Sequence, residues 1–214
     1  MTPSQIESKA RNKLNASTDQ LWSSNEIIED YLYEVCLEFS REVECIEDTF
    51  TTPSVASQQE YSLPSRYLKI LRVTWNGIKL QPITMREYDA LTFNAQTIPE
   101  GTPAYYYYFA GTIGLYPIPS DVENIKVWAI EAHDTITSAS TLDIPIQFHD
   151  MIVDGVTAKM AMKEIGDPRQ AFYASRWAQH LEVAKRQWRI HRRRDKPGMV
   201  QMEEMLPSTD FGVI

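Results

Sequence analysis

The sequence predicts an α+β fold that is mainly α: a helical bundle with an inserted small β-rich domain and an extended C-terminal arm. Apolar residues recur every three or four positions before residue 50 and again after Pro145, which is typical of amphipathic helices. Between these regions, short β-rich runs alternate with turn residues. We expect bundle helices in residues 1–50 and 134–194, the β-rich insertion with one short helix in residues 51–133, and the arm in residues 195–214.

Composition is that of an ordinary soluble protein. Apolar residues make up 43% and charged residues 23% of the 214 residues, which is enough for a packed core. No apolar run approaches the length of a membrane span, and the N-terminus lacks the basic-then-apolar pattern of a signal peptide. We therefore expect a protein kept in a cytoplasm, without a membrane partner.

Two helices are expected before residue 50. The first covers residues 3–14, where Ile6, Ala10 and Leu14 share one side. Ser23 and Glu26 have the spacing of a capping box and precede a longer amphipathic helix. The apolar stripe of that helix comprises Ile28, Leu32, Val35, Phe39, Val43 and Ile46.

Both cysteines, Cys36 and Cys45, fall on this longer expected helix. A rise of about 1.5 Å per residue would hold them about 13 Å apart, too far for a disulfide within the helix. We expect buried, reduced thiols.

The β-rich region contains two expected hairpins. Asn76-Gly77 lies between two β-rich runs and predicts a type I′ turn, because both residues tolerate positive φ. A second hairpin is expected to turn near Gly111, and the alternation in residues 123–133 predicts a further strand. Thr84 and Glu87 predict the cap of a short helix between the hairpins.

Two more helices follow Pro145. The first places Phe148, Ile152, Val156 and Met160 on one face, with Gly166 as its stop. Asp167 as cap and Pro168 at the first position predict the start of the second. The buried stripe expected for this last helix comprises Phe172, Trp177, His180, Leu181, Ala184 and Trp188.

Charge is unevenly distributed in this chain of net charge −8. Residues 26–48 are dense in carboxylates and residues 185–196 are strongly basic, which predicts an acidic face meeting a basic one, within the molecule or between copies. The basic segment offers a DNA contact, an intersubunit contact or a solvated helix end. Its arginines are Arg189, Arg192, Arg193 and Arg194. The acidic remainder argues against sequence-specific DNA binding.

The sequence offers no recognisable active site, so we expect no enzyme, catalytic residue, cofactor or metal. It contains neither a glycine-rich phosphate loop nor a nucleophile elbow. The best metal-like group is His149 with Asp150 and Asp154, but a helix-dipole role explains Asp150 better. A further hypothesis is an unrecognised enzyme, but the sequence contains no nucleophile and base at a spacing typical of an active site.

The run Tyr105–Tyr108 is the most conspicuous aromatic feature. Alternate side chains of a strand point to opposite faces, so at most two of these rings share one platform. We favour packing or an interface over sugar or base stacking, because tyrosine combines apolar area with a polar tip. The expected interface residues of the β-rich domain are Tyr105, Tyr107 and Tyr116.

The C-terminal arm is apolar without a helical period. Such a segment can order on a partner, and we favour docking over a frayed terminus. The expected docking residues are Met199, Met202, Met205, Leu206, Phe211 and Ile214.

An ordered set of short motifs, spanning roughly residues 10–195, resembles the head-to-tail adaptor (head-completion, or connector) proteins of tailed bacteriophages, particularly short-tailed ones. No single motif is specific, and the order carries the likeness. The motifs are Leu14-Asn15 with Leu21-Trp22-Ser23 and Glu26-Ile27, then Pro103 with Tyr105-Tyr106, GTIGLYPIP from Gly111, IKVWAI, Ile144-Pro145 with Phe148 and Ile152, and KEIGDP from Lys163.

This resemblance implies a homo-oligomeric ring, usually of twelve copies, that lies beneath the portal protein in the virion neck, extends the DNA channel and meets a tail or nozzle protein. It implies assembly in the host bacterial cytoplasm, non-specific proximity to packaged DNA, and arms that reach neighbouring virion proteins. It supplies no catalytic residues. The alternative is a DNA-binding module that uses the basic end of the last helix.

Overall fold

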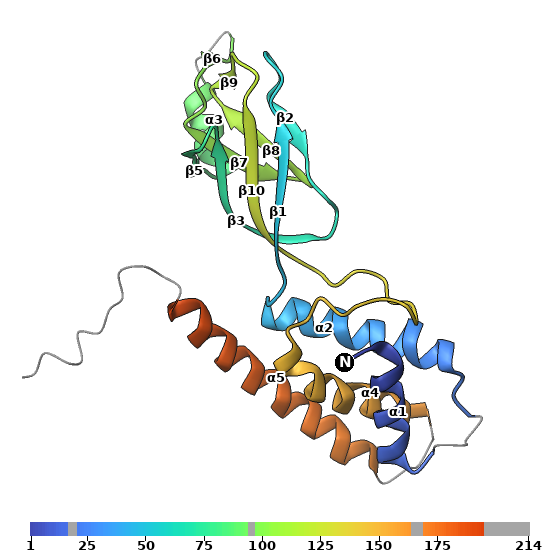
Figure 1. The fold of residues 1–214 in the computed structure, drawn as a ribbon. Helices are drawn as coiled ribbons and strands as arrows, with labels where there is room; N and C mark the ends of the chain where they lie inside the picture. Colours follow the sequence, from blue (N-terminus) through green and yellow to red (C-terminus); the bar gives the residue numbers. More distant parts are fainter. Residues whose placement is uncertain (17–20, 94–96, 164–168, 195–214) are drawn as a thin grey trace, which may run out of the picture.

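The computed structural model describes residues 1–16, 21–93, 97–163 and 169–194, with side chains as far as Ile190. Figure 1 shows two units placed end to end: a helical unit, formed by the described residues before 47 and after 131, and a β unit, formed by residues 47–131. The prediction of an α+β, mainly α fold with an inserted β-rich region is confirmed. The expected arm lies outside the described residues.

The helical unit packs its helices around one apolar core. The Phe39 ring lies at its centre, 5.3 Å from the Phe148 ring and 6.1 Å from the Trp177 ring between centroids. Gly155 permits close helix packing, since a Cβ there would lie 2.7 Å from Cγ1 of Val35. The elements are α1 Pro3–Leu14, the π-helix η1 Glu26–Leu32, α2 Tyr33–Val43, the 3₁₀ turn η2 Ile146–Phe148, α4 His149–Lys163 and α5 Arg169–Arg194.

The long helix expected in the acidic segment is present, but the structure differs from the expectation at both of its ends. Its first two turns form the π-helix η1, whose i to i+5 spacing places the Tyr31 hydroxyl 2.7 Å from Oε1 of Glu26 and buries both Ile27 and Leu32. The Ser23 hydroxyl does accept a hydrogen bond from the Glu26 N–H. At the other end, α2 stops at Val43 because Glu44 takes a left-handed conformation with φ 55°.

Two further expectations are corrected. Cys45 follows the end of α2, so the two cysteines do not share a helix, although both are buried and they form no disulfide with each other. Phe172 was expected in the buried stripe of α5, yet it is 57% exposed; it lies near the start of the helix, where its ring meets the neighbouring Tyr173 edge-on. Trp177, Leu181 and Ala184 are buried as predicted. Gly166, Asp167 and Pro168 lie outside the described residues.

The β unit is a sandwich of two main sheets with its own core. Sheet A has the strand order β1-β10-β3-β4, sheet B the order β2-β8-β7-β5, and β6 pairs with β9. Val73 and Val127 of sheet A face Ile113 and Leu115 of sheet B in a core separate from that of the helical unit. The strands are β1 Glu47–Pro53, β2 Glu60–Ser62, β3 Tyr67–Trp75, β4 Ile78–Lys79, β5 Gln81–Pro82, β6 Glu100–Gly101, β7 Tyr105–Phe109, β8 Thr112–Tyr116, β9 Ile118–Pro119 and β10 Asn124–Glu131.

Local turn and cap signals in the β unit are confirmed. Asn76 and Gly77 have φ of 48° and 76° and join β3 to β4 as a two-residue hairpin. Ala110 and Gly111 join β7 to β8 in the same way. Thr84 and Glu87 form the reciprocal capping box of α3, which spans Met85–Thr92.

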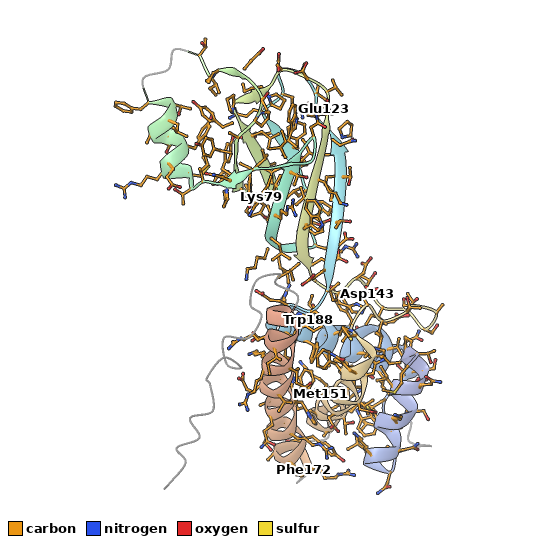
Figure 2. The ribbon with its side chains drawn as sticks, turned by 60° about the vertical axis from the view of Figure 1, so that its left-hand side comes forward. Lys79, Glu123, Asp143, Met151, Phe172 and Trp188 are labelled. Carbon is orange, nitrogen blue, oxygen red and sulfur yellow. The ribbon has the colours of Figure 1, made fainter. Side chains whose placement is uncertain are left out.

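Glu44 lies at the joint between the units. Its carbonyl oxygen accepts a hydrogen bond from Nε1 of Trp188 at 3.0 Å, while its carboxylate pairs with Lys69 of β3 at 3.1 Å. Nearby, the His133 N–H donates to the Ser40 hydroxyl at 3.1 Å. Figure 2 shows Trp188 at the end of α5 nearest the β unit and Phe172 at the far end. The strand β1 begins directly after this joint and therefore crosses the boundary expected between residues 50 and 51.

Candidate interaction surfaces

The acidic segment is paired within the chain. Three lysines of α4 and α5 reach glutamates on η1 and α2 that are distant in sequence. Of these lysines, Lys185 alone belongs to the basic segment that was expected to meet the acidic one. The Lys163 ammonium group lowers the pKa of Glu26, and Glu42 raises the pKa of Lys185. The pairs are Lys163–Glu26 at 2.6 Å, Lys159–Glu34 at 2.9 Å and Lys185–Glu42 at 2.6 Å.

The residues of the expected metal-like group serve separate roles. Asp154 is buried and bound by Lys13, by Nε of Arg176 at 2.9 Å and by Nε2 of His180 at 2.9 Å. Asp150 is exposed and pairs with Lys9 at 2.9 Å, which lowers its pKa. His149 is buried with Nε2 placed 2.8 Å from the Ile144 carbonyl oxygen, and burial lowers its pKa. Within the described residues, no three His, Cys, Asp or Glu side chains are grouped to hold a metal ion.

The tyrosine run alternates across sheet B. Tyr107 packs 4.6 Å from the Tyr88 ring of α3 and donates to Glu60 at 3.0 Å, and burial raises its pKa. The Tyr105 and Tyr116 rings, 6.5 Å apart, share this α3-covered face and remain partly exposed. Tyr106 points the other way, into the core. Tyr107 is therefore largely used within the chain, whereas Tyr105 and Tyr116 still offer surface.

A groove of about 360 Å³ opens between the two sheets. The strand β3 pairs with β4 only at Thr74 and Trp75, and β7 pairs with β5 only at Tyr105 and Tyr106. Beyond these pairs, the facing edges of β3 and β7 have no strand partner in the described part of the chain. The groove is lined by Tyr67, Leu68, Lys69, Ile70, Pro82, Ile83, Tyr106 and Tyr108.

The basic end of α5 is described only in part. Arg189 is exposed beside Arg186 and the 48% exposed Ile190, in a shallow depression of about 290 Å³. The side chains of Arg192, Arg193 and Arg194 lie outside the described residues, as do the six expected docking residues of the arm. The structure therefore leaves the four arginines and the arm as predictions.

The outer face of sheet A is a basic surface that the sequence reasoning missed. Arg72 and Lys126 each place their charged group 4.9 Å from the centroid of the Trp128 ring. Lys79 stands on the same face, since Thr74 pairs with both Lys126 and Lys79. The available signal was the period-two alternation of the two strands, with valines on one face and cations on the other.

Within the described residues, no helix has both the length and the apolar character needed to cross a membrane. Comparison with curated proteins finds no match. A protein-family model described as SU10 adaptor protein matches residues 1–201, nearly the whole chain. The match covers both units and agrees with the resemblance drawn from the ordered motifs. The chain therefore belongs to the SU10 adaptor protein family, and is a structural protein of the bacteriophage head–tail adaptor type.

Proposed function

We propose that copies of this chain assemble into a non-enzymatic ring, of twelve subunits, that joins the portal protein to the tail in the virion neck. The family match over residues 1–201 carries this proposal. The ring extends the DNA channel, meets a tail or nozzle protein, belongs to a short-tailed virion and assembles in the host bacterial cytoplasm. Packaged DNA passes close to it without sequence-specific contact.

The division into two units supports such a bridging role. In the helical unit, many side chains are already used within the chain, either in the buried core or in Lys–Glu ion pairs. The β unit projects from it (Figure 1) and carries an open groove and partly exposed tyrosines. A chain with different surfaces at its two ends can contact different partners there, which a connector requires. Tyr105 and Tyr116 are proposed contact residues of the β unit, and Tyr107 supports them from below.

The arm is proposed to dock on a neighbouring virion protein through Met199, Met202, Met205, Leu206, Phe211 and Ile214. The end of α5, with the exposed Arg189 and with Arg192, Arg193 and Arg194, is proposed to contact a neighbouring subunit or DNA in the channel. Exposure of Arg189 is also the observation that favours the second candidate function, a DNA-binding module.

Electron microscopy of the full chain incubated with its portal protein tests the proposal. A ring of repeated copies added to one face of the portal is expected, and absence of added density would overturn the proposed function. Deletion of residues 197–214 tests the arm separately. Replacing its six apolar residues by serine should weaken portal binding about tenfold or more, whereas replacing Gln201, Ser208 and Thr209 by alanine should not. If the serine variant still forms a ring on the portal with unchanged binding, only the docking role of the arm is refuted.

A further inference from the structure

The outer face of sheet A holds a group of cations around one indole ring. Val73 and Val127 point into the core, so their neighbours Arg72 and Trp128 point outward on paired positions of β3 and β10. Lys126 is two residues from Trp128 on the same strand and therefore shares this face. Figure 2 shows the covering helix α3 and the labelled Lys79 in the β unit, with α3 on the opposite side from β1. On the sheet A face, Arg72 and Lys79 are exposed in the part of the chain that the structure describes.

These cations are not neutralised within the described residues. Arg72, Lys79 and Lys126 form no ion pair with any carboxylate there, in contrast to Lys159, Lys163 and Lys185 of the helical unit. The nearest cation toward the joint, Lys69, is paired with Glu44. In a chain of net charge −8, three unpaired cations on one face are a local excess of positive charge that an anionic partner can neutralise.

The indole ring orders the cations and is unsuited to stacking a base. Arg72 and Lys126 both lie 4.9 Å from the ring centroid, at a distance where cation–π attraction restricts their side chains. With its surroundings occupied by charge, Trp128 supplies neither a free stacking platform nor the apolar centre that most protein interfaces have. The exposed Thr49 and Thr51 of β1, opposite Trp128 and Lys126, add hydroxyl groups.

We propose that this face, formed by Arg72, Lys79, Lys126 and Trp128 and called here the sheet A basic face, binds the phosphate backbone of duplex DNA without reading its sequence. Lysine, arginine and hydroxyl side chains are the groups that contact phosphates. The cations stand on three adjacent strands, about 10 Å across, a length over which duplex DNA presents about six charges. The proposal is independent of the ring and of the arginines at the end of α5.

Fluorescence anisotropy with a labelled mixed-sequence DNA duplex, titrated with the full chain at several low salt concentrations, tests this. Each phosphate contact adds about 0.9 to the slope of log affinity against log salt, so Arg72→Gln with Lys126→Gln should lower the slope by about 1.8 and weaken binding by roughly tenfold or more. The matched control, Arg41→Gln with Arg86→Gln, removes the same charge from exposed positions on α2 and α3 and should leave the affinity within about twofold. Thermal unfolding confirms that each variant is folded.

Trp128→Leu separates the ordering role of the ring from charge. It keeps every cation, so the salt slope should stay unchanged while the affinity falls by about two- to fivefold. The proposal is overturned if the wild-type chain does not bind DNA at low salt, or if the control variant of Arg41 and Arg86 weakens binding as much as the face variant. It is also overturned if polyglutamate competes as well as unlabelled DNA of equal charge, which would assign the face to an acidic protein partner.

Discussion

The helical unit and the outer face of sheet A in the β unit differ in how their charged side chains are paired. In the helical unit, lysines of α4 and α5 pair with glutamates of η1 and α2, and the buried Asp154 is surrounded by Lys13, Arg176 and His180. In the β unit, Arg72 and Lys126 lie against an indole ring and Lys79 has no acidic partner among the described residues. The helical unit uses these ion pairs to hold its helices together, whereas the outer face of sheet A leaves three cations available to a partner.

The two units also differ in how fully their cores and backbone edges are covered. The helices close around a core centred on Phe39, but the sandwich leaves the facing edges of β3 and β7 open over a groove. Unpaired strand edges invite pairing with another chain unless they are protected. The helical unit therefore encloses its core more completely than the β unit covers its strand edges, and three variants test the stability of the two units separately.

The largest effect is expected for Phe39→Ala in the helical unit. Removing a fully buried ring that packs against Phe148 and Trp177 leaves a cavity and should lower the free energy of unfolding by about 3–5 kcal/mol. Phe172→Ala, on a 57% exposed ring of the same unit, is the matched control and should cost about 0.5 kcal/mol or less.

Urea unfolding followed by fluorotryptophan NMR resolves the two units, because Trp177 and Trp188 report on the helices and Trp75 and Trp128 on the sandwich. The two cores share no residue, so Phe39→Ala should move only the helical transition. An equal shift of both sets of signals would show that the joint at Glu44 makes the molecule one cooperative unit.

A smaller effect, confined to the β unit, is expected for Gly114→Ala. The ring of Tyr107 lies directly over Gly114, so an added Cβ would overlap the ring and force it from its place beside Tyr88 and Glu60. Overpacking of this kind should cost about 1–3 kcal/mol of unfolding free energy, measured from the Trp75 and Trp128 signals. In a Tyr107→Ala background the same glycine substitution should cost little, and an unchanged cost there would contradict the steric explanation.

The smallest effect concerns the joint and depends on pH. Burial raises the pKa of Glu131 above its ordinary value of 4.5, and among the described residues its Oε2 finds no hydrogen-bond partner, although Arg66 lies 3.4 Å away. Because the folded state holds this proton more tightly, ionisation of Glu131 destabilises folding above that ordinary value. Glu131→Gln should therefore raise the melting temperature near neutral pH, and the gain should vanish as the pH falls below about 4.5.

Asp134→Asn is a control for which the opposite change in melting temperature is expected, although Asp134 pairs with the same Arg66. The Thr135 backbone N–H and Arg66 lower the pKa of Asp134, so its ionised form stabilises the fold above its ordinary pKa and loses this contribution as the pH falls. The asparagine variant should melt slightly lower at neutral pH and equal the wild type in acid. Melting curves in which both variants shift in the same direction would contradict the assignment of the two carboxylates.

Local patterns predicted most of the elements correctly. The Asn76-Gly77 turn, the Thr84 capping box and the stripe of Ile6, Ala10 and Leu14 depend on residues within a few positions of each other. The same reasoning failed where a distant contact intervened. A left-handed Glu44, bonded to both Trp188 and Lys69, ends α2 before Cys45, and no local signal marks that end.

By itself, the sequence determined the order and type of the elements and, through the ordered motifs, the adaptor family. Only the tertiary structure decided which charges are neutralised and which remain free. Lys159 meets Glu34 across 125 positions of sequence, whereas Lys126 meets an indole ring. Periodicity fixes the side of a helix or strand on which a residue lies, but the partner on that side is set by how distant segments pack, and that packing placed the basic face on sheet A.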